Sequence, residues 1–146
     1  MNAFVAAGAG FLLAVLWMDL MFDVQVLGAG GVIPVETLAS ISAYYARVTT
    51  AARPMNRLIA LVMLATIAAA ILEVAGEGTA ASWASLALLA AAIGLAGIRT
   101  VPAAVRLGAR SETSERQGEL ARGILREHIF CACCLAVVMV LQLALA

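Results

Sequence analysis

Lysine is missing from this sequence, and charged residues of any kind are scarce. All nine basic residues are arginine, and Asp, Glu, Lys and Arg together make up only 12% of the 146 residues. Soluble domains carry about 25% charged residues. The formal net charge is zero, so the composition implies no strong electrostatic attraction to nucleic acid, and no nucleic-acid partner is predicted.

The sequence also lacks a disulfide framework and several common catalytic motifs. Its three cysteines lie within one apolar run, and such an odd, clustered set is not typical of disulfide pairs. Cys131 and Cys134 share a helical face and could bind a soft ion such as Cu(I), although small apolar packing is the more common role. No Walker loop, GxGxxG, HExxH or GxSxG pattern occurs.

What the sequence does have is apolar residues, which make up 64% of the chain against about 45–50% in soluble domains. A helix that crosses a bilayer needs about 20 residues, and lipid offers no partner to open backbone groups. Four apolar runs therefore predict transmembrane helices at residues 3–26, 55–74, 79–99 and 124–145. The predicted fold class is all-α: an integral membrane four-helix bundle forming a single domain over residues 1–146.

The connection between the first and second spans and the one between the third and fourth spans are polar, and each has its own predicted conformation. Pro34 suits the first turn of a helix, and from Val35 apolar residues recur at helical spacing with polar residues on the other faces. This pattern predicts an interfacial amphipathic helix between the first and second spans. The segment from Thr100 to Arg126 is predicted to be a polar loop, with the fourth helix beginning near Glu115 in water.

Arginine placement predicts the orientation. The first and third loops, with the helix ends beside them, hold all nine arginines, whereas the second loop has only Glu73 and Glu77. The positive-inside rule then predicts a multi-pass protein of the cell membrane with both termini outside the cytoplasm. The lipid bilayer is the predicted partner. Small residues also permit close helix approach within or between copies, which leaves a homo-oligomer open.

In this orientation polar residues from all four spans gather at the cytoplasmic end, and the opposite half is almost wholly apolar. Asp19 and Asp23 are four residues apart and share a helical face. A charge in hydrocarbon costs about 2.5–3.5 kcal/mol, so Asp19 is expected to face the interior near His128. Asp23 is expected to lie within reach of an arginine. The candidate partners are Arg53, Arg57 and Arg99.

Three functions fit this cluster, and the sequence leaves all three open. A membrane enzyme would take a small hydrophobic substrate from lipid, with Asp19 or His128 as the catalytic base. Its substrate-binding residues would be Asp23, Arg53, Asn56, Arg57 and Arg99. A non-catalytic membrane module would use the same residues as a structural ion-pair cluster and would bind other helices. The cofactor, if there is one, stays unknown.

The third function is that of a metal or haem carrier that uses His128. Asp19, Asp23, Glu127 and His128 would make a set of hard to borderline ligands. Glu127 and His128 are adjacent, so they point about 100° apart and lack the Glu-x-x-His spacing of di-iron bundles.

Several short stretches resemble the anthrone-oxygenase-like family of small four-helix membrane proteins. They are Asp23-Val-Gln-Val, Ile33-Pro-Val-Glu-Thr-Leu, Ser40-Ile-Ser-Ala-Tyr-Tyr, Arg53-Pro-Met-Asn and the late Val101-Pro. The resemblance covers the layout of most of the chain and implies an oxidoreductase. The family's usual late Trp and Asn pattern is absent, and Arg126-Glu-His128 stands in that region.

A weaker likeness connects the chain with the membrane-associated eicosanoid and glutathione metabolism family. Arg53 and Asn56, at the start of the predicted second span, are similar to an Arg and an Asn of that family. Its members are about this long, have four helices and form trimers, so the resemblance implies a homo-oligomer. The acidic residue that follows the Asn in the family is missing here.

Overall fold

The computed structural model describes residues 2–76 and 78–144, and it describes Arg53 by its backbone alone. Every regular element in the described residues is a helix. Four helical segments are long and apolar enough to cross a membrane: Asn2–Gly28, Pro54–Gly76, Ala80–Ala109 and Ser114–Ala144. The prediction of an all-helical chain with four candidate membrane spans is therefore confirmed.

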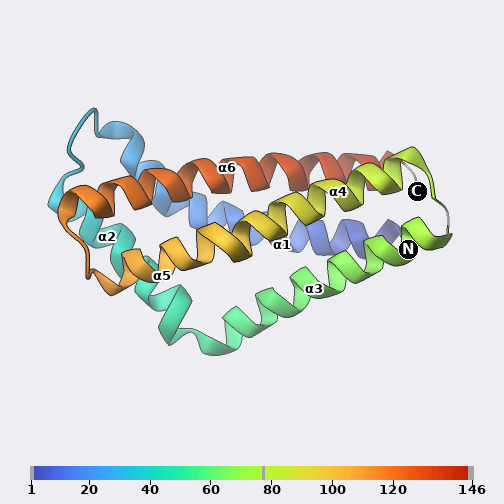
Figure 1. Cartoon of the computed structure of the whole chain (residues 1–146), viewed down its shortest axis with the longest axis horizontal. Helices are drawn as coiled ribbons and strands as arrows, with labels where there is room; N and C mark the ends of the chain where they lie inside the picture. The colour runs from blue at the N-terminus through green and yellow to red at the C-terminus, as the bar shows by residue number, and fades with distance from the viewer. Residues whose placement is uncertain (1, 77, 145–146) are drawn as a thin grey trace.

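Long helices run side by side along the molecule, and successive ones point in opposite directions (Figure 1). The long helix α6 packs against α1 and α4, and α3 packs against α1 and α4. At one end of the molecule α3 diverges from the other long helices, and α2 lies at that same end. The elements in chain order are α1 (Asn2–Asp23), η1 (Val24–Gly28), α2 (Val35–Ala46), η2 (Arg47–Ala51), α3 (Arg53–Gly76), α4 (Ala80–Leu95), η3 (Ala96–Thr100), α5 (Val101–Ala109) and α6 (Ser114–Ala144).

The predicted loop from Thr100 to Arg126 is mostly helix. A turn of π-helix, η3, joins α4 directly to α5, and Pro102 sits in the first turn of α5, where its missing N–H costs little. The chain leaves this helix at Arg110, whose left-handed backbone (φ 52°) is typical of a helix end. The start of the fourth long helix near Glu115 is confirmed, since α6 begins at Ser114.

A helix does lie between the first two spans, as predicted. Its buried side chains, among them Leu38 and Ile41, form a core with Leu107 of α5 and Ile124 of α6. Close contact with α5 depends on Gly108, because a Cβ there would lie 2.7 Å from the backbone nitrogen of Ala46. The apolar face of α2 is thus covered by protein, which fixes α2 against α5 and α6.

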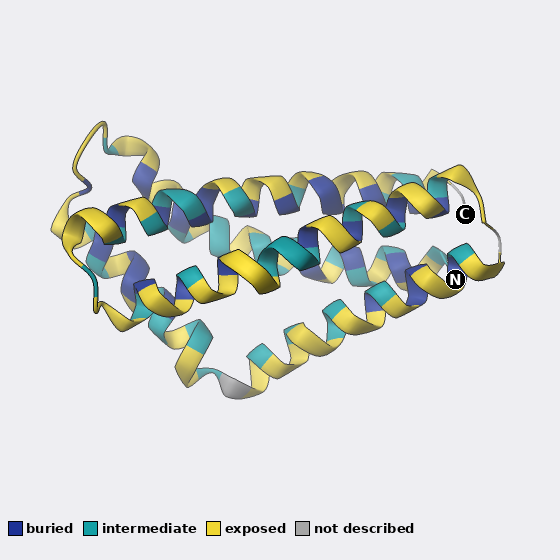
Figure 2. Ribbon diagram, in the orientation of Figure 1, coloured by how far each residue is buried: buried dark blue, intermediate teal, exposed yellow. Residues whose placement is uncertain are grey.

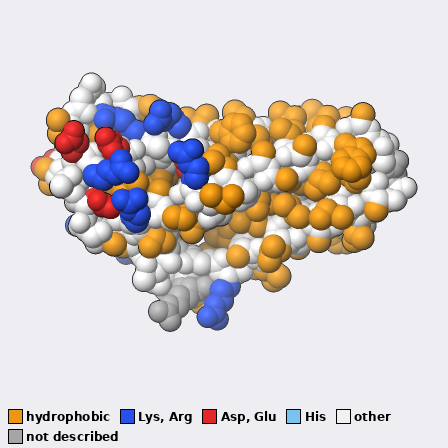
Figure 3. Space-filling view, viewed as in Figure 1, with side chains coloured by type: hydrophobic (Ala, Val, Ile, Leu, Met, Phe, Trp, Pro, Cys, Tyr) orange, Lys and Arg blue, Asp and Glu red, His pale blue; other side chains and the backbone are white. Residues whose placement is uncertain are grey.

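The molecule presents two kinds of surface. Large apolar side chains are exposed along the long helices, among them Phe4, Trp17, Leu64 and Val140. Exposed residues follow the outward faces, while buried ones face the neighbouring helices (Figure 2). On the face seen in Figure 3 most of the charged side chains gather at the end where α5 and α6 meet, and the surface along the long helices is mainly apolar. Such an apolar surface suits a lipid environment.

The expectation that the half away from the arginines is almost wholly apolar is wrong. Gln142 of α6 donates from Nε2 to Oε1 of Glu73 at 2.9 Å and to Oγ of Ser85 at 3.1 Å. All three side chains are buried. The two hydrogen bonds of Gln142 join α6, α3 and α4, while Oε2 of Glu73 and Oε1 of Gln142 have no hydrogen-bond partner among the described residues.

Replacing Gly108 with alanine should destabilise the fold. The new methyl group must displace the backbone of α2, and overpacking of this kind costs about 1–3 kcal/mol. The free energy of unfolding can be measured by SDS titration in mixed micelles. Gly94→Ala is the matched control, because no atom lies within 4 Å of a Cβ there. Equal stability of the two variants would contradict the close packing of α2 on α5.

Candidate functional site

A fully buried carboxylate is the centre of the polar end. Asp23, the last residue of α1, has no exposed surface, and both of its oxygens are hydrogen-bonded. Its Oδ2 lies 2.6 Å from Nδ1 of His128, and its Oδ1 accepts a hydrogen bond from the Tyr45 hydroxyl at 2.6 Å. These contacts join α1, α2 and α6 at one point.

A second carboxylate lies one helical turn earlier. Asp19 accepts a hydrogen bond at Oδ1 from the Tyr44 hydroxyl at 2.6 Å. The Tyr44 ring stacks on Phe22, with 4.0 Å between ring centroids, and meets the Tyr45 ring edge-on. The two aspartates, four residues apart on α1, therefore face two consecutive tyrosines of α2. Each carboxylate accepts a hydrogen bond from a different tyrosine hydroxyl.

Both phenols are held in the neutral, donating form. Burial, first of all, raises the pKa of Tyr45 well above its ordinary value, and the Asp23 carboxylate raises it further. Burial and the hydrogen bond to Asp19 likewise raise the pKa of Tyr44. The two hydroxyls are donors rather than bases at any physiological pH, which leaves the basic role to the carboxylates and the imidazole.

A cavity of about 700 Å³ lies beside this cluster, between the N-terminal half of α3 and the other helices. Its walls are mainly apolar, and it lies on the side where α3 diverges (Figure 1). The four long helices contribute to the walls together with α2, η2, η3 and α5. The volume falls in the range of about 300–1,000 Å³ that is usual for small-molecule sites. The polar side chains of its lining are Asp19, Tyr44, Tyr45, Thr49, Asn56, Thr100, His128 and Cys131.

His128 connects the buried cluster with the cavity. Its Nδ1 contacts Asp23, which does not line the cavity, whereas the ring itself does. No described residue is hydrogen-bonded to Nε2. The second ring nitrogen is therefore available to a molecule in the cavity, while the carboxylate fixes the orientation of the ring.

Asn56 also lines the cavity, as its assignment to substrate binding requires. Its Nδ2 donates one hydrogen bond to the backbone oxygen of Thr49 at 2.9 Å, which ties the start of α3 to the end of η2. An amide nitrogen carries two hydrogens, so one N–H stays available. The Oδ2 atom of Asp19 likewise has no hydrogen-bond partner among the described residues.

Two of the three predicted arginine partners of Asp23 are elsewhere. Arg99 lies 3.2 Å from Glu127, and its side chain is largely exposed. Arg57 is exposed and lines no described cavity. The side chain of Arg53 lies outside the described residues. The expectation of an Asp23–arginine bridge is wrong for Arg57 and Arg99, because Tyr45 and His128 occupy both oxygens of this dry carboxylate.

The four proposed metal ligands are not brought together. Glu127 accepts a hydrogen bond from the Thr100 hydroxyl at 2.8 Å and pairs with Arg99, on a face of α6 that His128 does not share. Within residues 2–76 and 78–144, no three His, Cys, Asp or Glu side chains group as a metal site. His128 alone retains a free nitrogen backed by a carboxylate, an arrangement that metal-binding histidines also use.

The cysteines divide between interior and surface. Cys131 and Cys134 are buried, and Cys133 is exposed. Cys131 contacts the backbone oxygen of Ala92 at 3.5 Å and lines the cavity one turn beyond His128. Cys131 and Cys134 pack with Ala92 in one core cluster, as expected for cysteines that act as small apolar side chains.

Comparison with known proteins finds no homologue of this chain. The chain matches no family model, no curated protein and no solved structure. The case for a function therefore depends on the geometry of this end of the molecule.

Sequence reasoning missed the part played by the two tyrosines. Tyr44 and Tyr45 were not among the candidate site residues, yet they are the donors to Asp19 and Asp23. The signal was present in the pairing of an Asp-x-x-x-Asp spacing with adjacent tyrosines on a short amphipathic helix.

Removing the hydroxyl of Tyr45 should destabilise the protein more than removing that of Tyr44. Tyr45→Phe leaves a fully buried carboxylate oxygen without its donor, and a hydrogen bond to a charged group contributes about 1.5–3 kcal/mol. Tyr44→Phe is the matched control, because Asp19 is only partly buried. The free energy of unfolding in mixed micelles provides the comparison, and equal losses would refute a special role for Asp23.

Proposed function

We propose that the chain is a membrane enzyme that binds a small apolar carbonyl compound beside His128 and removes a proton from the carbon next to the carbonyl. The observation that carries this proposal is the Asp23–His128 contact of 2.6 Å at the wall of a mainly apolar cavity. A carboxylate that holds one imidazole nitrogen orients the ring and stabilises the imidazolium that forms when the other nitrogen accepts a proton.

The substrate class follows from the cavity. Its lining is dominated by aliphatic, aromatic and methionine side chains, such as Phe11, Val15, Ile59 and Met63. Such walls favour an apolar molecule that partitions into lipid and enters between α3 and its neighbours. A charged substrate would lose its hydration here without a matching ion pair, because no arginine lines the cavity among the described residues.

Each polar group has one part in the proposed step. Nε2 of His128 accepts the proton, the electron pair passes into the carbonyl to give an enolate, and the free N–H of Asn56 is a donor for the enolate oxygen. Asp23 positions the imidazole and does not touch substrate. Asp19, the other base considered from sequence, supplies a second acceptor through its free Oδ2.

The membrane arrangement is part of the proposal. Four spans pack as a bundle, α2 lies at the interface, and the polar end that carries His128 faces the cytoplasm. Support for this orientation comes from the arginines, all of which lie in η2, at the start of α3, or from the end of η3 into the first half of α6.

A non-catalytic membrane module is the second candidate. Both oxygens of Asp23 are satisfied by protein donors in a buried setting, and a fully paired cluster of this kind also serves to fix helix packing. On this alternative the cavity binds lipid chains or another helix, and His128 transfers no proton.

Topology can be checked with reporters. Alkaline phosphatase fused after Ala146 should be active, because that end is expected outside the cytoplasm, and the same enzyme fused after Arg110 should be inactive. Green fluorescent protein at the two positions should give the reverse pattern. Phosphatase activity after Arg110 would overturn the orientation.

Proton removal can be detected without knowing the substrate. Purified protein in lipid nanodiscs is incubated in D₂O with an apolar extract of its host cells, and a compound that gains deuterium through the enzyme is found by mass spectrometry. His128→Gln should slow this exchange at least about 100-fold, the usual contribution of a general base, while the compound still binds.

Two alanines of α3 provide matched controls for the cavity. Ala60 lines it and Ala65 does not, and both are exposed on the same helix. Ala60→Trp should abolish binding and exchange together, whereas Ala65→Trp should change neither. Exchange that survives in His128→Gln would refute the catalytic role, and binding without exchange in the unaltered protein would establish the non-catalytic alternative.

A further inference from the structure

A second hollow, separate from the cavity at His128, lies between α5 and the N-terminal part of α6. It has a volume of about 640 Å³, and five arginines line it: Arg99, Arg106, Arg116, Arg122 and Arg126. The charged patch in Figure 3 covers this end of α5 and α6. We call this hollow the arginine cleft.

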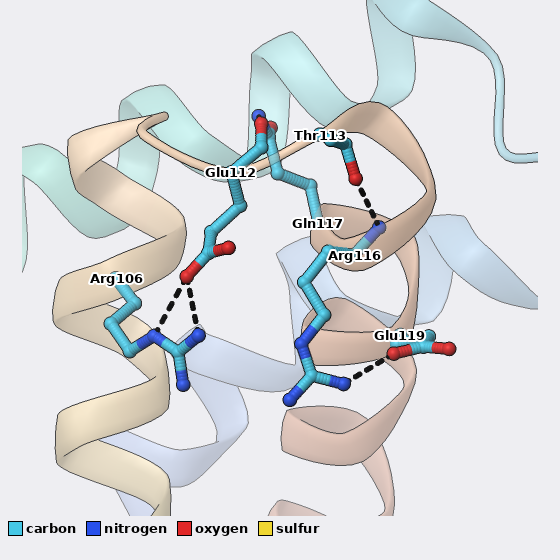
Figure 4. A network of polar contacts seen from close by, with 6 residues as sticks. All are labelled: Arg106, Glu112, Thr113, Arg116, Gln117 and Glu119. Atoms are coloured by element: carbon cyan, nitrogen blue, oxygen red, sulfur yellow. Dashed lines mark hydrogen bonds and ion pairs between the residues drawn. The ribbon is translucent and has the colours of Figure 1, made fainter.

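Carboxylates offset only part of this positive charge. Three of the arginines are paired: Arg99 with Glu127, Arg106 with Glu112 and Arg116 with Glu119, the last two shown in Figure 4. Arg122 donates to the backbone oxygens of Ala29 and Gly31 and meets no carboxylate. Arg126 has no hydrogen-bond or ion-pair partner among the described residues and is exposed. Two guanidinium groups are therefore left without a counter-ion.

The chemistry of the cleft favours phosphate. Guanidinium presents a planar fork of N–H donors that matches two phosphate oxygens, and it stays charged at every physiological pH. Several such forks around one hollow repel each other, and a bound anion reduces that repulsion. A phosphate diester carries one negative charge, so Arg122 and Arg126 are sufficient to neutralise it.

The surroundings of the cleft point to phosphate that belongs to a lipid. Ile98, Pro102 and Leu120 form an apolar part of its lining, and the Ile98 side chain is 80% exposed. The cleft thus lies where the apolar surface of α4 meets the charged end of the molecule (Figure 3). A headgroup in the cleft would leave its acyl chains along that apolar surface, as in basic pockets between membrane helices.

We propose that the arginine cleft binds the phosphate of an anionic membrane lipid. Arg126 is its free contact, Arg122 supplies the second charge without a counter-ion, and the three paired arginines form the rest of the rim. This site shares no cavity with His128, so the proposal is independent of the proton-transfer chemistry.

Native mass spectrometry of the detergent-purified protein tests the site. Phosphatidylglycerol is titrated against the unaltered chain, Arg126→Gln and the control Arg47→Gln, which removes the same charge from an exposed residue outside the cleft. Affinity should fall about fivefold in Arg126→Gln and should not change in Arg47→Gln. Arg126→Lys should recover part of the affinity, since it restores charge without the bidentate fork.

Two competitors separate the sources of phosphate. Phosphatidylcholine, which has no net charge, should bind weakly and equally to all variants, and millimolar glycerol 3-phosphate should not displace phosphatidylglycerol. Full displacement by glycerol 3-phosphate would overturn the lipid assignment in favour of a soluble phosphate compound. Equal affinity in Arg126→Gln and Arg47→Gln would overturn the site itself.

Discussion

The burial of one carboxylate organises the polar end of this protein. Asp23 lies where water does not reach, and a buried carboxylate needs donors for its oxygens. The donors come from α2 and α6, through Tyr45 and His128. Once those two bonds are made, the short helix α2 cannot slide along the long helices, and the remaining nitrogen of the imidazole has a fixed place at the cavity wall. Packing and chemistry at this end thus depend on the same two contacts.

Much of the framework could be predicted from composition and spacing alone. The four candidate spans, the helix after Pro34 and the start of α6 all follow from apolar runs and capping patterns, which depend on neighbours in sequence. The inward placement of Asp19 beside the cavity of His128 follows from the cost of a charge facing lipid. These predictions needed no knowledge of which helices touch.

Partner choice could not be predicted, because it depends on how α2 is placed. Asp19 was expected near His128, yet the hydrogen-bonded partner of the histidine is Asp23. The Asp23 oxygens contact Tyr45 and His128 rather than Arg57 or Arg99. Long arginine side chains can reach water from this end of the molecule. Their guanidinium groups therefore stay hydrated rather than enter a dry site. A phenol loses less hydration on burial than a guanidinium, which favours Tyr45 as the donor.

Hydropathy also concealed the polar cross-link at the other end. Gln142 lies within an apolar run and Glu73 at the edge of one, so an average over about 20 residues treats both as minor interruptions. Gln142 donates hydrogen bonds to Glu73 and to Ser85 of a third helix, and the three residues meet only when the helices pack.

The stretch from η3 into α5 lies between the cavity at His128 and the arginine cleft, and it contributes side chains to both. Thr100 and Ala104 face the apolar cavity, while Arg99 and Ala103, their neighbours in sequence, face the arginine cleft. The Thr100 hydroxyl donates a hydrogen bond to Glu127, so a residue of the cavity lining contacts a residue of the cleft lining. Enlarging Ala104 would reduce the volume of the cavity, and enlarging Ala103 would reduce the volume of the cleft. The same short stretch of chain therefore sets part of the shape of both hollows.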